Sequence, residues 1–576
     1  MYIRNGFFIL ENSSTYRFLL RKLLLSGVCF FFLLNVFAQK SIYFPPPPKD
    51  TSRKKKIEIL KSDSLLFQTQ ELGKYRKLIG NVKLRHDNAL MFCDSAVIDI
   101  DANYMTAFGK QVHIQKGDSV DVWGNFLEYF GDQKLGRLTG MCSMRDKTMI
   151  LTTPELNYNT ETDVGNYMSG GRIVNKETTI TSAIGYYYHQ KSEAVFYGDV
   201  VLKTPERTIY ADSMRYNTDK EIAYFITKTT IIDKDSNIIV TNSGYYDTKN
   251  EKAFFGNNAV IKKGDASVKA ENIDYDNKTK IAVAQGDVVY SDSSERTTIL
   301  SNYVYSDENK SYVKAYKDPL MITVSEDEKD TMYLSADTLL TYKIAVEDSV
   351  LNNDTISSND SIKILKAYYH MKMIQGEMSA SADSMFYSEK DSIFKLYINP
   401  VMWMDSTQIT GDSIYLYNTN KEISRVDIFG NAFIINLQDK DIYNQIKGKF
   451  MQAFISNKKI QKVEVDGNAE SIYFIKDKGA YNGANKSTSA FITVSFEKDD
   501  VNRIKLTGTP EAEFTPMKKI TPETFRLEGF KWYGDKQPLT KYDVIRDKSQ
   551  YEKYIAGLPI KKVEVIEEKK EEEIKN

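Results

Sequence analysis

Residues Gly198–Ile226 read GDVVLKTPERTIYADSMRYNTDKEIAYFI, and this stretch decides the fold. Its segments of β-branched and aromatic residues are typical of strands, and polar residues separate them. Asn217-Thr218-Asp219-Lys220 predicts a turn, because Asn and Asp tolerate left-handed backbone and bond to their own main chain. The stretch therefore predicts three consecutive strands: Asp199–Lys203, Thr208–Tyr216 and Glu221–Ile226.

The same unit recurs along the chain, and one tyrosine before each polar turn marks it. The marker residues are Tyr129, Tyr158, Tyr188, Tyr216, Tyr246, Tyr275 and Tyr305. They are 28 to 30 residues apart, and a period this regular indicates a repeat architecture. Units of this kind bury their apolar face by stacking on their neighbours.

Composition and charge support an all-β chain and exclude one class of function. The 576 residues include 38 Tyr and 29 Phe but only 13 Pro, and a chain of this length exceeds one compact domain. The formal net charge is −1. Nucleic-acid binding needs a basic stripe or patch, so we expect no nucleic-acid partner.

The N-terminus has the pattern of a secretory signal peptide. Arg21-Lys22 precedes the apolar core Leu23–Val36, and Ala38 precedes the expected cleavage site. An uncleaved membrane anchor is the alternative. Export would permit a disulfide between Cys93 and Cys142, although two buried free thiols are the favoured interpretation.

Six regions follow from composition and repeats, and they are listed here in chain order. Residues 1–38 are the signal peptide, 39–76 a Pro-rich and basic linker, 77–342 a first series of β-jellyroll repeats, 343–363 an acidic polar insert, 364–530 a second β-jellyroll segment, and 531–576 a charged C-terminal tail with a possible short helix. The insert is poor in apolar residues and predicts a surface loop or hinge between two stacked segments.

Within each unit the apolar positions alternate, and then the alternation slips by one residue. The slip falls at Asp212, Asn242 and Glu271. A slip of one residue reverses the face of every later side chain unless a bulge or bend absorbs it. We therefore expect each strand to turn a corner there, so that two sheets meet at an edge and enclose an apolar interior.

That interior is either a packed core or a groove for acyl chains, and the sequence leaves both open. If it is a groove, the inward residues are its candidates. They are Leu156, Ile209, Met214, Tyr216, Ile239, Ile273, Tyr275 and Tyr303.

Catalytic and metal-binding patterns are missing from the sequence. The chain has four His, without HExxH or CxxC spacing, and neither a GxSxG pattern nor a P-loop occurs. The series Asp94, Asp212, Asp337, Asp383 and Asp412 could bind Ca²⁺ or act in acid–base chemistry. Our preferred interpretation is that each carboxylate satisfies backbone groups at a bend. We expect no catalytic residue, no metal and no cofactor.

The repeated G-[ND]-V openings resemble those of a known family. Gly80-Asn81-Val82-Lys83-Leu84, Gly198-Asp199-Val200-Val201-Leu202 and Gly286-Asp287-Val288-Val289 each precede an Ala-Asp-Ser-like strand. This series, over residues 77–510, is similar to OstA-like proteins, which share the β-jellyroll of LptA and of the N-terminal part of LptD. The resemblance implies a V-shaped β-jellyroll stack and a lipid carried along its interior.

The resemblance also implies the partners and location. We expect a periplasmic protein, associated with the outer membrane of a Gram-negative cell, that binds lipopolysaccharide or a related lipid and pairs end to end with other β-jellyroll proteins. It is expected not to be an enzyme. The alternatives are a structural or adhesive envelope protein without lipid transport, and a carbohydrate-active β-solenoid enzyme.

Overall fold

The computed structural model describes residues 55–67, 75–325, 330–345, 361–419, 422–477, 479–497 and 500–558. The predicted signal peptide at 1–38 lies outside these residues. So do most of the linker, most of the acidic insert and the end of the tail. In the described part of the chain, no helix has both the length and the apolar composition to cross a membrane.

The first half of the chain forms the strands β1 to β23. They are β1 (Glu58–Lys61), β2 (Ser64–Phe67), β3 (Tyr75–His86), β4 (Ala89–Asp99), β5 (Tyr104–Lys116), β6 (Val120–Phe130), β7 (Leu135–Arg145), β8 (Ile150–Asn159), β9 (Val164–Tyr167), β10 (Gly171–Asn175), β11 (Thr178–Ser182), β12 (Ile184–Tyr188), β13 (Glu193–Lys203), β14 (Arg207–Asn217), β15 (Ile222–Phe225), β16 (Thr229–Asp233), β17 (Ile238–Thr241), β18 (Ser243–Asp247), β19 (Lys252–Gly256), β20 (Ala259–Lys263), β21 (Ala266–Ala270), β22 (Asn272–Asp276) and β23 (Ile281–Asp292).

The second half contributes β24 to β40 and two short helices. The strands are β24 (Thr297–Asp307), β25 (Tyr312–Tyr316), β26 (Leu320–Val324), β27 (Thr331–Ser335), β28 (Thr338–Ala345), β29 (Ser361–Gln375), β30 (Met378–Ser388), β31 (Ile393–Tyr397), β32 (Val401–Met404), β33 (Thr407–Thr410), β34 (Ser413–Thr419), β35 (Glu422–Asp439), β36 (Ile442–Ser456), β37 (Lys459–Asp477), β38 (Ala480–Glu497), β39 (Asp500–Thr507) and β40 (Glu511–Pro516), and the helices are α2 (Lys541–Val544) and α3 (Lys548–Ala556).

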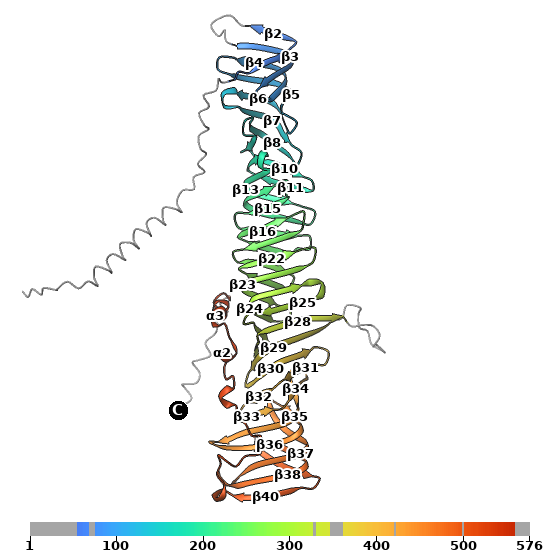
Figure 1. Cartoon of the computed structure of the whole chain (residues 1–576), viewed down its shortest axis with the longest axis vertical. Coiled ribbons are helices and arrows are strands. Elements are labelled where there is room, and N and C mark those ends of the chain that lie inside the picture. Colours follow the sequence, from blue (N-terminus) through green and yellow to red (C-terminus); the bar gives the residue numbers. More distant parts are fainter. Residues whose placement is uncertain are drawn as a thin grey trace, which may run out of the picture. The chain divides into compact units, whose positions relative to one another are not determined.

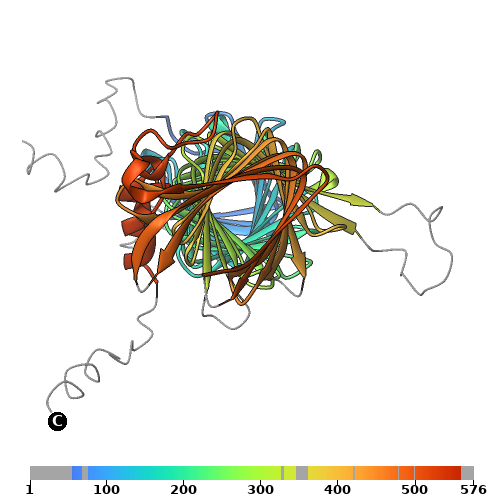
Figure 2. The same cartoon turned by 90° about the horizontal axis from the view of Figure 1, so that it is seen from below.

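The described strands join into one antiparallel, hydrogen-bonded ladder. A bulge at the corner of each unit divides the ladder into two facing layers, which we call the two sheets. Within the unit Lys56–Asn576, the strands stack in chain order (Figure 1). The view along the stack shows them wound around a common axis (Figure 2). The fold is the all-β, repetitive β-jellyroll that the sequence predicts.

The corner of each unit explains the G-[ND] signature. Gly198 and Asp199 both have positive φ, 75° and 49°. They lie together opposite Asp212, since Tyr197 pairs with Ser213 and Val200 pairs with Ala211. Two successive left-handed residues favour Gly followed by Asn or Asp, and this bulge absorbs the predicted slip at Asp212. The same pair of positive φ angles recurs at Gly80-Asn81, Gly286-Asp287, Gly430-Asn431 and Gly467-Asn468.

Two of the seven marker tyrosines, Tyr188 and Tyr305, do not occupy the inward position of their unit. The candidate groove residue Tyr303 does not face inward either. Tyr187, not Tyr188, is the inward residue, and it is 1% exposed. In the last unit Val304 is the buried residue, and Tyr303 lies on the outer face with its ring 4.4 Å from that of Tyr316. The bulge of that unit faces Asn302, one residue later than the marker implied, so Tyr303 is turned outward.

The limits of the repeats also differ from the sequence expectation. The strands β1 and β2 already pair with β3, inside the predicted linker 39–76. The two ends of the predicted hinge at 343–363 belong to the hairpin of β28 and β29, in which Lys343 pairs with Lys363 and Ala345 pairs with Ser361. The sheet therefore runs on without interruption, because a long connection within a hairpin leaves the ladder intact.

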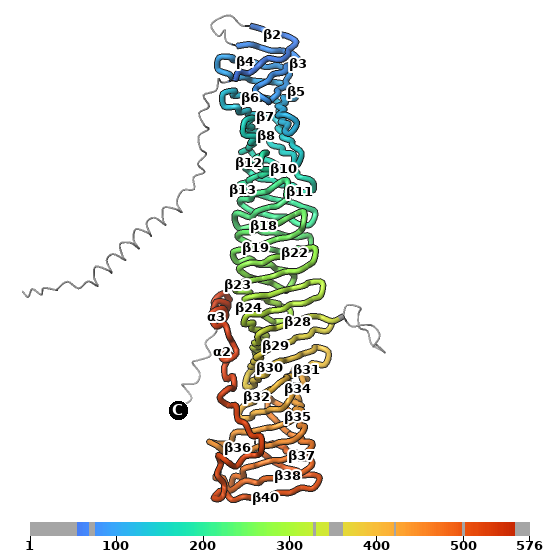
Figure 3. The backbone as a smooth tube through the Cα atoms, in the orientation of Figure 1, coloured from blue at the N-terminus to red at the C-terminus, as the bar shows by residue number. Residues whose placement is uncertain are grey.

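Residues 517–558, which we call the strap, return along the outside of the stack (Figure 3). Residues 531–558 of the predicted charged tail are part of the strap and include the short helix α3. Two hydrophobic clusters attach the strap: Leu527 packs with Phe433 and Phe474, and Tyr551 packs with Leu300 and Ile322.

Three buried glutamines complete the attachment of the strap. Gln408 Nε2 donates to the Lys531 carbonyl at 2.7 Å, and Gln445 Oε1 accepts from the Leu527 N–H at 2.8 Å. Gln550 Nε2 donates to the Ser301 carbonyl at 2.9 Å. Two of these side chains belong to the sheet and one to the strap, so the contact is built from both sides.

Candidate functional site

The hairpin ends of the two sheets face each other along a line that we call the seam. Buried tyrosines of one sheet reach polar groups from the hairpins of the other. Tyr129 shares a hydrogen bond of 2.8 Å with His86, and Tyr216 donates to Asn175 at 3.4 Å. Tyr187 donates to the Asp146 carboxylate. These contacts join residues 41 to 43 positions apart, so they hold the two sheets together.

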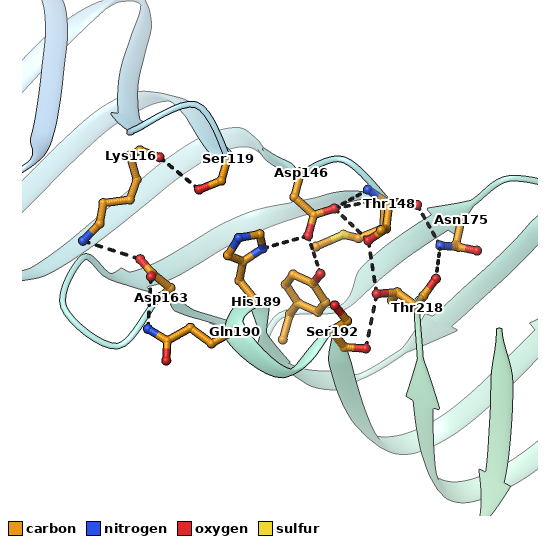
Figure 4. Close-up of polar contacts among 12 residues, drawn as sticks. Lys116, Ser119, Asp146, Thr148, Asp163, Asn175, His189, Gln190, Ser192 and Thr218 are labelled. Carbon is orange, nitrogen blue, oxygen red and sulfur yellow. Dashed lines mark hydrogen bonds and ion pairs between the residues drawn. The ribbon is translucent and has the colours of Figure 1, made fainter. Parts of the chain in front are cut away.

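Asp146 is the centre of the largest of these networks (Figure 4). Its side chain is 1% exposed, and it accepts from the backbone N–H groups of Thr148 at 2.7 Å and Met149 at 2.9 Å. His189 Nδ1 lies 3.0 Å from Oδ2. Burial alone would raise the pKa of Asp146, but the hydrogen bonds from Tyr187, Thr148, His189 and Met149 outweigh it and lower this pKa.

Further links close the seam around this network. Asn175 Nδ2 donates to the carbonyls of Thr148 at 2.7 Å and Thr218 at 3.0 Å. Lys176 pairs with Glu221 at 2.5 Å. Earlier in the stack, the Lys56 ammonium donates to the Asp101 carbonyl at 2.9 Å. We call this part, from residue 56 to 221, the closed seam.

Later in the chain lies a cleft of about 1200 Å³, lined by residues between Ser294 and Lys458. Ion pairs bridge the seam nearby: Lys263 with Glu308 at 2.7 Å, Lys363 with Glu295, and Lys458 with Asp330 at 3.0 Å. The cleft has an apolar floor and a polar rim. The floor is Met332, Met373, Met378, Met404, Tyr387, Phe394, Ile423 and Ile455, and the rim includes Glu295, Arg296, Asp330, Gln375, Glu377, Asn418, Glu422 and Lys458.

The predicted groove residues do not line this cleft. Leu156, Ile209, Met214 and Tyr216 are fully buried in the main hydrophobic core. Ile239 and Ile273 belong to the same core, Tyr275 packs against it, and Tyr303 faces outward. The cleft residues lie later in the chain, where the repeats are less regular. The methionines in Met371–Met378 and Val401–Met404 were the available signal, since methionine is common at adaptable binding surfaces.

The aspartate series satisfies local polar groups at the corners. Asp94 Oδ2 accepts from the Lys110 N–H at 2.8 Å, and Asp412 accepts from Asn431 Nδ2 at 3.0 Å. Asp337 pairs with Arg546 of the strap at 2.5 Å. Among the described residues, no group of three or more His, Cys, Asp or Glu could hold a metal ion.

The two cysteines after the predicted cleavage site are buried and free. Burial raises the pKa of Cys93 to about 12 and that of Cys142 to about 11. The favoured interpretation of two buried thiols is confirmed, and the fold does not depend on a disulfide.

Part of the chain is similar to known protein families. Residues 54–212 match the family described as OstA-like protein, and residues 179–312 match the LptA/(LptD N-terminal domain) LPS transport protein family. LptH from Pseudomonas aeruginosa, the LptA homologous periplasmic component of the lipopolysaccharide transport device, is 15% identical. That match covers 20% of this chain and 84% of LptH, with a TM-score of 0.18. No curated protein matches the chain. The two family matches overlap and together span residues 54–312, so this part of the chain is similar to OstA-like proteins and to LptA and the N-terminal domain of LptD.

Proposed function

We propose that the protein binds and transfers a lipopolysaccharide-type lipid in outer-membrane biogenesis. The cleft of about 1200 Å³ carries this proposal. Ligand pockets for small molecules usually measure about 300–1,000 Å³, so this cleft has room for a larger, amphiphilic ligand. The family match of residues 54–312 supports the same class of ligand.

The chemistry of the cleft suits an amphiphile. Acyl chains need unbroken apolar surface, and the methionine-rich floor supplies it with flexible side chains that can adapt to different chains. A polar headgroup needs water or charged partners, and the rim offers both signs of charge. The half-buried ammonium of Lys363, whose pKa is lowered by burial, pairs with Glu295 of the rim.

The ends of the sheet suit end-to-end assembly with other β-jellyroll proteins. Among the described strands, β2 pairs only with β3, and β40 pairs only with β38. Unpaired strand edges can bind a further strand. We place the protein in the periplasm, associated with the outer membrane, and assign it no catalytic role and no cofactor.

A structural envelope protein remains the second candidate function. It is favoured by the closed seam, behind which Leu156, Met214 and Tyr216 are fully buried as in an ordinary core. The two functions differ in one respect, namely whether lipid reaches the cleft.

Photo-crosslinking from cells tests the proposal. A photoreactive residue at Met332 in the cleft should capture lipid, and one at Arg215 on the outer face should not. Met214 inside the closed part serves as a buried control. Folded protein that captures no lipid at Met332 would contradict lipid transfer and favour the structural function.

A further inference from the structure

Arg207 stands at the point where the closed seam ends. It is the first residue of β14 and is only 7% exposed. It faces Tyr246, which holds in β18 the position that Tyr216 holds in β14, because Ala223 of β15 pairs with both tyrosines. The preceding tyrosines, Tyr187 and Tyr216, each donate a hydrogen bond to a side chain across the seam.

Among the described residues, Tyr246 has no corresponding hydrogen bond to a side chain across the seam. The guanidinium carbon of Arg207 lies 4.4 Å from the centre of the Tyr246 ring. The Nε atom is fully buried and has no hydrogen-bond partner. Nowhere in the described part of the chain does the guanidinium have an ion-pair partner.

The neighbouring carboxylates are occupied elsewhere. Glu206 pairs with Lys234 at 2.8 Å. Asp233 lies opposite Arg207 on β16, but its Oδ1 accepts from the backbone N–H groups of Asp235 and Asn237, both at 2.9 Å. Neither carboxylate therefore forms an ion pair with Arg207, although the charge of Glu206 attracts it at longer range. The face of the Tyr246 ring offsets a further part of the cost of burying the guanidinium.

A buried charge without a partner is unfavourable, and proteins usually pair it or bind an ion to it. Guanidinium groups match carboxylate and phosphate oxygens in a bidentate arrangement. Toward the core, the neighbours of Arg207 are apolar: Ile209 and Ile231 are fully buried, and Tyr275 packs against the same core. An anion that carries an apolar part fits these surroundings.

We propose that Arg207 is the binding site for the anionic group, a phosphate or carboxylate, of an amphiphile that lies between the two sheets. The inference rests on the proposed function and adds to it a negatively charged ligand and the residue that recognises it. The acyl chains would extend toward the cleft, where the seam is open.

The test compares two lipids with the same acyl chains, phosphatidic acid and diacylglycerol, each in mixed micelles, with inorganic phosphate as a third probe. The full exported chain is compared with Arg207→Met and with the control Arg215→Met. Arg215 stacks on Tyr224 at 4.3 Å on the outer face, so the control loses the same kind of ring contact without a buried charge. Binding and the thermal midpoint are measured for each protein.

The unsubstituted protein should bind phosphatidic acid about tenfold more tightly than diacylglycerol, as expected for a hydrogen bond to a charged group. Arg207→Met should lose this preference, and Arg215→Met should keep it. Without ligand, Arg207→Met should melt at the same or a higher temperature, because it removes an unpaired buried charge.

Each other result has a definite meaning. If Arg207→Met keeps the preference, or melts lower than Arg215→Met without ligand, Arg207 is a structural residue and the inference is wrong. If phosphate alone stabilises only proteins that contain Arg207, the anion site is supported and its ligand is a free anion. If neither lipid binds the unsubstituted protein, the proposed function is wrong. If both lipids bind it equally well, only the inference about Arg207 is wrong.

Discussion

Asp146→Asn should weaken the closed seam, and the structure gives the size of the effect. The carboxylate accepts from the Tyr187 hydroxyl, from Thr148 and Met149 N–H groups, and lies 3.0 Å from His189 Nδ1. Asparagine keeps one acceptor oxygen and adds two N–H donors, so at least one hydrogen bond to a charged group is lost. The expected decrease in the free energy of unfolding is about 1.5–3 kcal/mol.

The same substitution should change the response to acid. The pKa of Asp146 is lowered in the folded protein. Its contribution to stability is therefore fully present above the unfolded-state pKa of about 3.9 and is lost as the pH falls through the folded-state pKa. The destabilisation by Asp146→Asn should be largest near neutral pH and should shrink below about pH 4.

Urea unfolding followed by circular dichroism, at several pH values, measures both effects. The midpoint should shift without a change in the slope, which would indicate altered stability rather than altered compactness. Asp212→Asn is the matched control, because this exposed corner carboxylate accepts a hydrogen bond only from its neighbour Ser213 at 3.1 Å among the contacts described. A shift no larger than that of Asp212→Asn, or one equally large at low pH, would refute this account of the seam.

Three further predictions concern the corner, the cleft and the strap. Gly198→Ala should destabilise the protein by roughly 1–2 kcal/mol in thermal unfolding, because φ is +75° there and Ala183 Cβ lies 3.0 Å from the added carbon; an unchanged midpoint would contradict the corner. Met373→Asp should reduce lipid capture in folded protein, since a carboxylate on the floor disfavours acyl chains; unchanged capture would place the lipid elsewhere. Gln445→Ala should expose residues 517–558 to limited proteolysis by leaving the Leu527 N–H unpaired, at a cost of about 1–3 kcal/mol, whereas an unchanged cleavage rate would show that the hydrophobic clusters alone hold the strap.

The sequence was sufficient for the repeat and its corner. Local residue preferences recur in every unit. They predict the period, the three strands around Gly198–Ile226 and the slip at Asp212. The sequence pattern was less reliable in Ser301–Asp307, where both Tyr303 and Tyr305 lie near the marker position. The repeat pattern predicts that Tyr303 faces inward. It faces outward because the bulge is shifted there by one residue, and a shift of one residue reverses the face of a strand.

The seam, the cleft and the strap were decided only by the tertiary structure. Asp146 and His189 are 43 residues apart, Gln445 and Leu527 are 82 apart, and Asp330 and Lys458 are 128 apart. Such pairs leave no periodic signal in the sequence. Their contact depends on the twist between stacked units, because this twist determines which hairpins face each other across the seam. The inward side chains by themselves were compatible with a core or a groove. The structure shows both in different parts of the same chain: a packed core where the sheets close over Tyr187 and Tyr216, and a cleft lined by residues between 294 and 458.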